Sequence, residues 1–279
     1  MKLSPNNLYI VSTPIGNLDD ITIRAIDVLK HSDIILCEDT RRSLKLLNHF
    51  KIKKKLLSYH KFNEKKKVSS IIEYINQGKI LSLISDAGTP LLSDPGLLLI
   101  NNCIKNKINI IPIPGVSSIT TAMSISGFND KFLFYGFLPK TENQLEKVLL
   151  PLSKNYYSQI FFIPAIKVNF YLKKFKKHFT GRKVLIAKEL TKIHETLFRE
   201  NVDDIKLFKN TMKGELTVII SEKITSRLLL DEEKIVNKAK IYLKKYSLRD
   251  TVNLILESEK INKKEIYKLC LKVKNEKNY

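Results

Sequence analysis

The chain has 279 residues, of which 43% are hydrophobic, and its formal net charge is +21 at pH 7. This length suits two compact domains with apolar cores, whereas no stretch approaches the ~18 consecutive apolar residues of a membrane helix. The N-terminal residues lack the apolar segment of a secretory signal, and Cys37, Cys103 and Cys270 have no metal-like spacing, so we expect a cytoplasmic protein with three unpaired thiols and no metal site.

The first half of the chain alternates strand-like and helix-like segments. Apolar runs predict strands at residues 8–12, 33–37, 56–59, 80–84 and 108–111, and helical periodicity predicts helices at 20–30, 41–50, 64–77, 95–106 and 116–126. Thr40 is expected to cap the second of these helices. Apolar strands separated by helices are typical of βαβ units, so this half is predicted to form a parallel sheet covered on both faces.

The pattern changes after Gly127. Strands are predicted at 132–137, 159–163, 183–187, 195–199 and 215–221, with helices at 142–152 and 168–179, which indicates a second α/β domain with some antiparallel pairing. Beyond these come only helices, at 231–246, 248–258 and 263–273, which predict a helix-turn-helix-like appendage. The expected domains are therefore residues 1–115, 116–226 and 227–279.

Three turns rich in glycine and proline each follow an apolar strand of the first half, at residues 12–17, 85–90 and 112–118. Ligands of open α/β sheets bind outside the carboxyl ends of the strands, so the three turns indicate one ligand cleft. Glycine permits close backbone approach and proline fixes the turn. The ligand is therefore expected to be held mainly by main-chain groups.

Three motifs, in this order, resemble those of the ribosomal RNA small subunit methyltransferase I family, which has the tetrapyrrole-methylase fold. They read LYIVSTPIGNLDDIT at 8–22, EDTR at 38–41 and SDAGTP at 85–90, and the likeness runs from about residue 8 to about residue 273. The resemblance implies two α/β domains with S-adenosylmethionine in the cleft between them, and a homodimer. It also implies methyl transfer to the 2′-hydroxyl of a cytidine in the decoding region of 16S rRNA, with the small ribosomal subunit as partner.

The three turns and the resemblance together suggest a set of cofactor-binding residues: Pro14, Gly16, Asp86, Ala87, Gly88, Gly115, Ser117 and Ser118. The first turn would form a floor beside the methyl group, and the third would offer N–H groups and hydroxyls at a helix N-terminus to the methionine carboxylate. Each has a purely structural alternative, namely a strand-to-helix turn, an Asx-turn at Asp86 and a helix cap.

Catalysis requires positioning and a base. An in-line displacement needs the ribose oxygen close to the methyl group, and the weakly acidic hydroxyl gains from a base as its proton leaves. Glu38, Asp39 and His60 are the candidates, and the sequence does not choose among them. For Glu38 and Asp39 the alternative is a surface charge cluster, and for His60 it is a structural histidine.

Three arginines are assigned to RNA, because a planar guanidinium suits phosphate: Arg24, Arg41 and Arg42. The net charge itself has two explanations, RNA binding or the lysine-rich composition of an AT-rich genome, since only seven of the 49 basic residues are arginine. The last helix poses the same choice: Lys263, Lys264, Lys268 and Lys272 could dock on RNA phosphates or form a solvated face.

One segment departs from the family pattern. The usual aromatic-Glu-Ser-x-His-Arg run is replaced by FFIPAIKV at 161–168, where only Lys167 offers a positive charge, and Pro-Gly-Pro becomes Pro114-Gly115-Val116. The changes at 163–168 keep a non-catalytic RNA-binding descendant open as an alternative. A second alternative, from a different substrate class, is a tetrapyrrole or precorrin methyltransferase. The second is disfavoured because the turn at 13–17 lacks the Gly-x-Gly-x-Gly-Asp loop usual in those enzymes.

Overall fold

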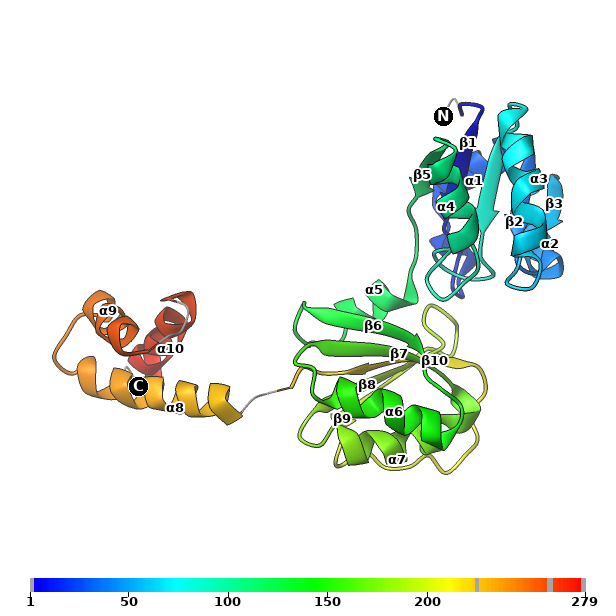
Figure 1. Ribbon diagram of the computed structural model, residues 1–279. Coiled ribbons are helices and arrows are strands. Elements are labelled where there is room, and N and C mark those ends of the chain that lie inside the picture. Colours follow the sequence, from blue (N-terminus) through cyan, green and yellow to red (C-terminus); the bar gives the residue numbers. More distant parts are fainter. Residues whose placement is uncertain (1–2, 224–225, 260–262, 277–279) are drawn as a thin grey trace. The chain divides into compact units, whose positions relative to one another are not determined.

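The computed structural model describes residues 3–223, 226–259 and 263–276. The chain forms two compact units, Met1–Glu222 and Lys223–Tyr279. The first unit contains two five-stranded sheets and the second contains helices (Figure 1). The first unit includes both sheets, so this division does not test the domain boundaries expected at 115/116 and 226/227, which stay predictions.

The first sheet is parallel throughout, as predicted. Its strands are β1 (Asn7–Val11), β2 (Ile34–Cys37), β3 (Lys55–Ser58), β4 (Leu81–Ile84) and β5 (Asn109–Ile113), in the order β3-β2-β4-β1-β5. Strand β5 runs two residues further than expected and includes Pro112. A proline is tolerated there because β5 is an edge strand with one unpaired side.

Helices cover both faces of this sheet, as expected for βαβ units. They are η1 (Leu18–Asp20), α1 (Ile23–His31), α2 (Thr40–His49), α3 (Glu64–Asn76) and α4 (Leu97–Lys105). Side chains alternate along β1: Tyr9 and Val11 join the core beneath α1 and α2, whereas Leu8 and Ile10 join the core beneath α3 and α4. The strand ends are thereby held at one edge of a rigid sheet.

Three local predictions were wrong. Thr40 does not cap α2; the Asp39 side chain does, by accepting a hydrogen bond from the Arg41 N–H at 2.9 Å. The helix expected at 20–30 begins three residues later, at Ile23, because Thr22 caps α1 and residues 18–20 form a separate 3₁₀ turn capped by Asn17. The helix expected at 116–126 is shorter, α5 (Ser118–Ser124).

The second sheet is mixed, which confirms the expected antiparallel pairing. Its strands are β6 (Phe132–Phe137), β7 (Ser158–Pro164), β8 (Lys183–Lys188), β9 (Thr196–Asn201) and β10 (Glu215–Ile220), in the order β6-β7-β10-β8-β9. Only the β6–β7 pair is parallel. Helix α5 packs on one face, and α6 (Glu142–Ser153) and α7 (Val168–His178) pack on the other; η2 (Ala165–Lys167) follows β7.

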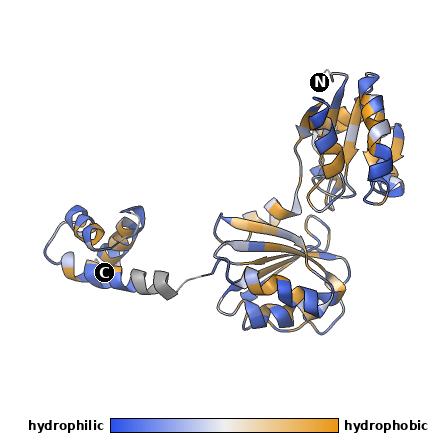
Figure 2. Cartoon of the chain, viewed as in Figure 1, coloured by the Kyte–Doolittle hydropathy of each residue, from blue (hydrophilic) through white to orange (hydrophobic). Residues whose placement is uncertain are grey.

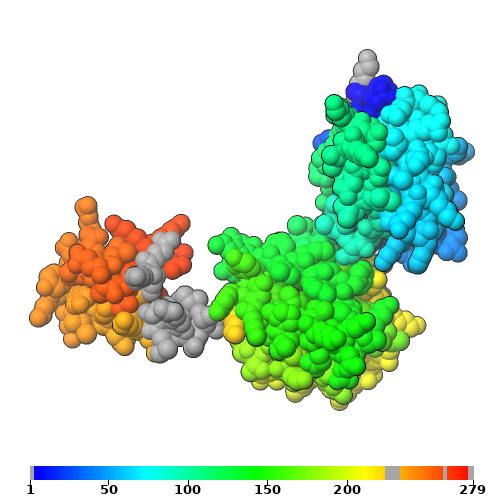
Figure 3. Space-filling view, viewed as in Figure 1, coloured from blue at the N-terminus to red at the C-terminus, as the bar shows by residue number. Residues whose placement is uncertain are grey.

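The C-terminal unit consists of α8 (Ser226–Tyr242), α9 (Leu248–Ser258) and α10 (Lys263–Glu276). It has an apolar core of its own, formed by Ile235, Ala239, Val252, Ile255, Ile266, Cys270 and Val273. Figure 2 shows hydrophilic residues on the outward sides of these helices, and Figure 3 shows α9 and α10 gathered into one small body.

The three cysteines are unpaired and buried, as predicted from their spacing. Within the described ranges, no helix combines the length and apolar character needed to cross a membrane.

The approach of β1 to the turn after β5 can be tested at Gly115. A Cβ atom added there would lie 2.8 Å from the Ser12 Cβ atom, so Gly115→Ala is expected to lower the free energy of unfolding by ~1–3 kcal/mol through overpacking. Denaturant unfolding measures this loss. The double variant Ser12→Gly/Gly115→Ala removes the opposing Cβ atom and is expected to recover part of it. Simple additivity of the two substitutions would contradict the close approach.

Candidate active site

The structure brings the three glycine and proline turns together. They follow β4, β1 and β5, which are neighbours in the sheet. Thr13 and Gly88 exchange main-chain hydrogen bonds of 2.9 and 3.0 Å, and the Ser12 N–H donates to the Ile113 carbonyl at 3.2 Å. The Ser12 and Thr89 hydroxyls lie 3.1 Å apart. Backbone groups of three separate chain segments therefore form one continuous surface.

A cavity of about 790 Å³ opens beside this surface and is lined by residues from both sheets. Half of the predicted site residues line it: Glu38, Arg42, Asp86, Ala87, Gly88, Ser117 and Ser118. From the second sheet and its loops come Phe137, Phe162, Pro164, Ala187, Glu189, Lys192, Gly214, Glu215, Leu216 and Thr217. Ser117 precedes α5 without capping it through its side chain, so its hydroxyl is available to a ligand.

Pro14, Gly16 and Gly115 support the cavity rather than line it. Pro14 and Gly16 flank Ile15, whose side chain does line it. Gly16 packs against the loop after β8: a Cβ atom there would lie 2.5 Å from the Lys192 Cγ atom. The neighbouring Asn17 N–H donates to the Thr191 hydroxyl at 3.0 Å, which joins the first turn to the second sheet.

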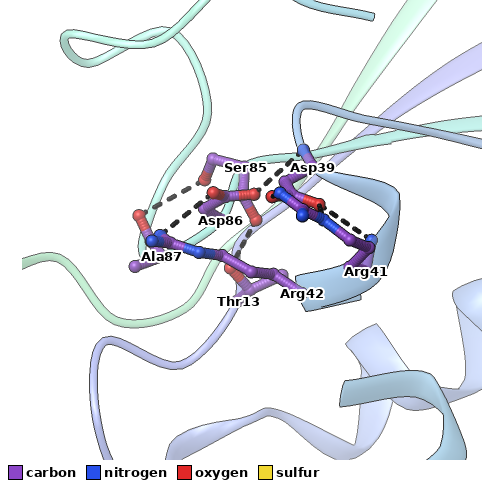
Figure 4. A network of polar contacts seen from close by, with 7 residues as sticks. All are labelled: Thr13, Asp39, Arg41, Arg42, Ser85, Asp86 and Ala87. Carbon is purple, nitrogen blue, oxygen red and sulfur yellow. Dashed lines mark hydrogen bonds and ion pairs between the residues drawn. The ribbon is translucent and has the colours of Figure 1, made fainter. Parts of the chain in front are cut away.

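The Asp86 carboxylate connects two loops instead of forming an Asx-turn. One oxygen accepts a hydrogen bond from the Asp39 N–H at 3.2 Å, and the other pairs with the Arg42 guanidinium at 3.1 Å. Figure 4 shows this carboxylate between the two partners, with Ser85 bonded to Thr13 behind it. Arg42 thus has a carboxylate partner in the cavity wall.

Asp39 is held by its neighbour and is poorly suited to be a base. The Arg41 guanidinium contacts both carboxylate oxygens, at 3.1 and 2.7 Å. These side-chain hydrogen bonds, together with the Arg41 N–H, hold the pKa of Asp39 far below its usual range. A carboxylate that binds protons so weakly accepts one poorly from a ribose hydroxyl. Neither Asp39 nor Arg41 lines the cavity.

His60 and Arg24 also lie outside the cavity lining. Both ring nitrogens of His60 contact local groups, the Phe62 N–H at 3.3 Å and the Asn63 side-chain amide at 3.1 Å. The Arg24 guanidinium donates to the Pro112 carbonyl at 3.5 Å and is exposed. The contacts of His60 are therefore those of its structural alternative, and Arg24 lies exposed beside the edge strand β5, away from the cavity.

Asp94 is a cavity residue that sequence reasoning missed. Burial, followed by the negative charges of Glu38 and Asp86, raises the pKa of Asp94 to about 6. Burial and the Asp86 charge also raise the pKa of Glu38. Such shifts arise where like charges are crowded away from water, which is characteristic of functional sites. The Asp94-Pro95-Gly96 turn signal in the sequence could have drawn attention to it.

Two loops beside the cavity hold ordinary residues in the left-handed region. Leu91 and Ser93 in the Asp94 loop have φ of 73° and 77°, and Glu189 and Thr191 after β8 have φ of 51° and 67°. This conformation is costly for residues other than glycine, and such strain gathers at ligand sites. Both loops beside the cavity therefore hold residues in a conformation that their own side chains do not favour.

Carboxyl groups outnumber basic groups around the cavity. Five carboxyl residues line it, Glu38, Asp86, Asp94, Glu189 and Glu215, against the two basic residues Arg42 and Lys192. Apolar walls are supplied by Ile15, Phe137, Phe162 and Leu216. The cavity therefore suits a ligand with a positive centre and an apolar part. The described part of the chain has no group of three or more His, Cys, Asp or Glu residues that could hold a metal ion.

The segment that departs from the family pattern contributes only its apolar residues to the cavity. Phe162 and Pro164 line it, whereas Lys167 does not. The Lys167 ammonium contacts the Lys140 carbonyl at 3.4 Å and lies 6.0 Å from the centre of the Phe170 ring. It does not supply the cavity with a replacement charge; the cations there are Arg42 and Lys192.

Comparisons with known proteins agree with this architecture. Residues 7–206 match the family described as Tetrapyrrole (Corrin/Porphyrin) Methylases. Proteins named ribosomal RNA small subunit methyltransferase I are 41% identical in Rickettsia prowazekii, covering 96% of this chain and 98% of that protein, and 42% identical in Thermotoga maritima, covering 77% and 98%. A solved structure of similar fold is the uroporphyrin-III C-methyltransferase of Thermus thermophilus, complexed with S-adenosylhomocysteine. Its TM-score is 0.53 at 14% sequence identity, and the match covers 77% of this chain and 97% of that chain, so the two proteins share a fold.

The fold, with its two sheets and the cavity that both of them line, is that of the tetrapyrrole methylases. The chain belongs to that family, and within it to the ribosomal RNA small subunit methyltransferase I family. The resemblance found in the three sequence motifs is thereby confirmed.

The mutual influence of the cavity carboxyls can be measured. Asp86→Asn keeps an acceptor for the Asp39 N–H but removes a negative charge that raises the pKa of both Asp94 and Glu38. The pKa of Asp94 is therefore expected to fall from about 6 towards the ordinary aspartate value. Carboxyl-carbon NMR titration measures it, with Glu73→Gln on the exposed side of α3 as control. An unchanged Asp94 pKa in Asp86→Asn would contradict the cluster.

Proposed function

We propose that this protein transfers a methyl group from S-adenosylmethionine to the ribose 2′-hydroxyl of a cytidine in the 16S rRNA of the small ribosomal subunit. The observation that carries the proposal is the cavity at the three backbone turns, because most of its lining residues lie within residues 7–206, which match the family, and because it combines the turns with carboxyls of raised pKa. The substrate follows from the names of the relatives that match along most of their length.

The residues of the cavity fit S-adenosylmethionine. This molecule supplies an activated methyl group on a positively charged sulfonium, and the excess of carboxyl groups favours such a charge. We assign its polar contacts to the main chain of Ala87 and to the hydroxyls of Ser117 and Ser118, while Gly88, whose main-chain groups are bonded to Thr13, allows the ligand a close approach; all four residues line the cavity. The apolar side chain of Ile15 offers a surface for the uncharged part of the molecule.

Asp94 is our candidate for the base, with Glu38 beside it. Both line the cavity, whereas Asp39 and His60 do not. A carboxyl with a pKa of about 6 is ionised at neutral pH yet binds a proton more tightly than an ordinary aspartate. Asp94 would accept the proton of the ribose hydroxyl as the oxygen attacks, and the Glu38 charge keeps the Asp94 pKa raised.

The tetrapyrrole alternative is supported by the name of the wider family and by the shared fold, but solved tetrapyrrole methyltransferases are only 14–17% identical to this chain. The relatives at 41–42% identity carry the ribosomal RNA name. The non-catalytic alternative rested on the altered residues 163–168. In the structure this segment supplies apolar wall, and the charged groups of the cavity come from other loops.

Two further parts of the proposal follow from the resemblance. The substrate would place the reaction in the cytoplasm, where small ribosomal subunits are found. The protein is also expected to be a homodimer, which light scattering of the purified chain tests directly.

The activity is tested with labelled S-adenosylmethionine and small ribosomal subunits from a strain that lacks the modification. The expected product of nuclease digestion is a labelled 2′-O-methylated cytidine, because the attacking atom is a ribose oxygen. Subunits from a strain that already has the modification are the control. Label in a base, or label in a porphyrinogen with none in rRNA, would contradict the proposal.

Replacing Asp94 by Asn is expected to lower kcat by ~10²–10⁴-fold, the usual contribution of a positioned base. Asp39→Asn retains a side chain that can cap α2, so its loss is expected to stay below about tenfold. In the unmodified enzyme, kcat should fall as pH drops below about 6, because Asp94 then takes up a proton. Equal kcat values for the two variants would refute the role of Asp94.

A further inference from the structure

We propose that the exposed face of α10 is a second, separate binding surface of this protein, and that its ligand is the phosphate backbone of RNA. The choice of RNA rests on the proposed function, but the surface lies in the C-terminal unit and includes no residue of the cavity. It would add affinity for the substrate without taking part in the methyl transfer.

Lysines are denser on α10 than on the other helices of the C-terminal unit, since α8 has three in its 17 residues. Helix α10 has five lysines in its 14 residues, whereas α9 has no lysine in its 11 residues. The exposed side of α9 carries Asp250 and Glu257 instead, with Arg249. A lysine-rich composition alone would enrich all helices alike, so this contrast indicates a face with a specific charge.

The lysines of α10 lie on the side that faces away from the unit's core. Ile266, Cys270 and Val273 are buried in that core. Lys264, Lys268 and Lys272 follow one another at intervals of four residues and form one row along the helix. Lys263 and Lys274 lie on a second, neighbouring row, near its two ends. All five lysines are exposed.

Four of these lysines have no carboxylate partner among the side chains that the structure describes. Among the described side chains, none forms an ion pair with Lys263, Lys268, Lys272 or Lys274. Lysines of α8 behave differently: the ammonium groups of Lys234 and Lys238 lie 2.8 and 2.7 Å from a Glu259 oxygen. The charge of α10 is thus available to an external anion, and counterion release would drive its binding to a polyphosphate.

An aromatic ring lies between the two lysine rows. Tyr267 is 47% exposed and Leu271, one turn further on, is 36% exposed. Exposed aromatic rings interleaved with basic residues are the pattern on which unpaired bases stack, which favours RNA with single-stranded segments over a uniform duplex.

The comparisons suit an added role for this unit. The relative from Thermotoga maritima is matched over 98% of its own length but covers 77% of this chain, and the family match ends at residue 206. The unmatched part, about a quarter of the chain, is large enough to contain the whole C-terminal unit. A unit without a counterpart in such a relative is suited to gripping the substrate rather than to completing the cavity.

The test uses the full-length chain and measures binding to a 16S rRNA transcript at several salt concentrations, with no methyl donor present. The test variant replaces Lys263, Lys268, Lys272 and Lys274 by Gln. It is expected to bind at least ~10-fold more weakly at about 0.1 M salt, and the slope of log affinity against log salt should become shallower by about 3, because each phosphate contact contributes ~0.7–0.9.

Two matched variants make the result specific. Replacing Lys105, Lys107, Lys147 and Lys173 by Gln changes the charge equally on exposed positions of the first unit and is expected to bind like the unmodified chain. Replacing the four α10 lysines by Arg keeps the charge and is expected to keep the affinity and the slope. Retained binding by the Arg variant distinguishes lost charge from lost folding of the unit.

Equal affinity and slope for the α10 Gln variant and the first-unit control would overturn the proposal, as would tighter binding of the unmodified chain to duplex DNA of the same length.

A kinetic measurement separates RNA binding by α10 from methyl transfer in the cavity. With small subunits as substrate, the α10 Gln variant is expected to raise KM and to leave kcat unchanged. If no methyl transfer occurs at all, the binding measurement still decides whether α10 holds RNA.

Discussion

Two main-chain hydrogen bonds between Thr13 and Gly88 hold the turn after β1 against the turn after β4. The third turn, after β5, adds to this contact, because Gly115 lies so near Ser12 that a Cβ atom would be 2.8 Å away. No side chain of ordinary size fits between these segments. The three turns consequently meet through close main-chain contacts, and residues of all three line the cavity.

The crowded carboxylates of the cavity repel one another and so destabilise the folded state. Burial, followed by the negative charges of Glu38 and Asp86, raises the pKa of Asp94, and burial with the Asp86 charge raises the pKa of Glu38. The Arg42 guanidinium, on the solvent side of Asp86, offsets part of this repulsion. A bound sulfonium would offset more of it, so the ligand is expected to stabilise a site that is unfavourable without it. The left-handed residues Leu91 and Ser93 belong to the same loop as Asp94 and show that its position is imposed by the fold.

Most of the fold was predictable because apolar runs and helical periodicity are local signals. All ten strands were placed within two residues at their ends, and the convergence of three turns followed from a general property of parallel sheets. Side-chain direction was not predictable in the same way. Asp39 and His60 follow strands just as Glu38 does, yet one is held by Arg41 and the other contacts Asn63. Asp94 was missed because a loop of left-handed residues, rather than a strand end, brings it to the cavity.

The central claim is that S-adenosylmethionine or its demethylated product binds against the three turns. Amide hydrogen exchange of the full chain with and without S-adenosylhomocysteine tests it most directly. Binding at the turns is expected to slow exchange in residues 12–18, 85–96 and 114–118 and to leave α10 unchanged. Binding without protection of these turns, or protection confined to other segments, would contradict it.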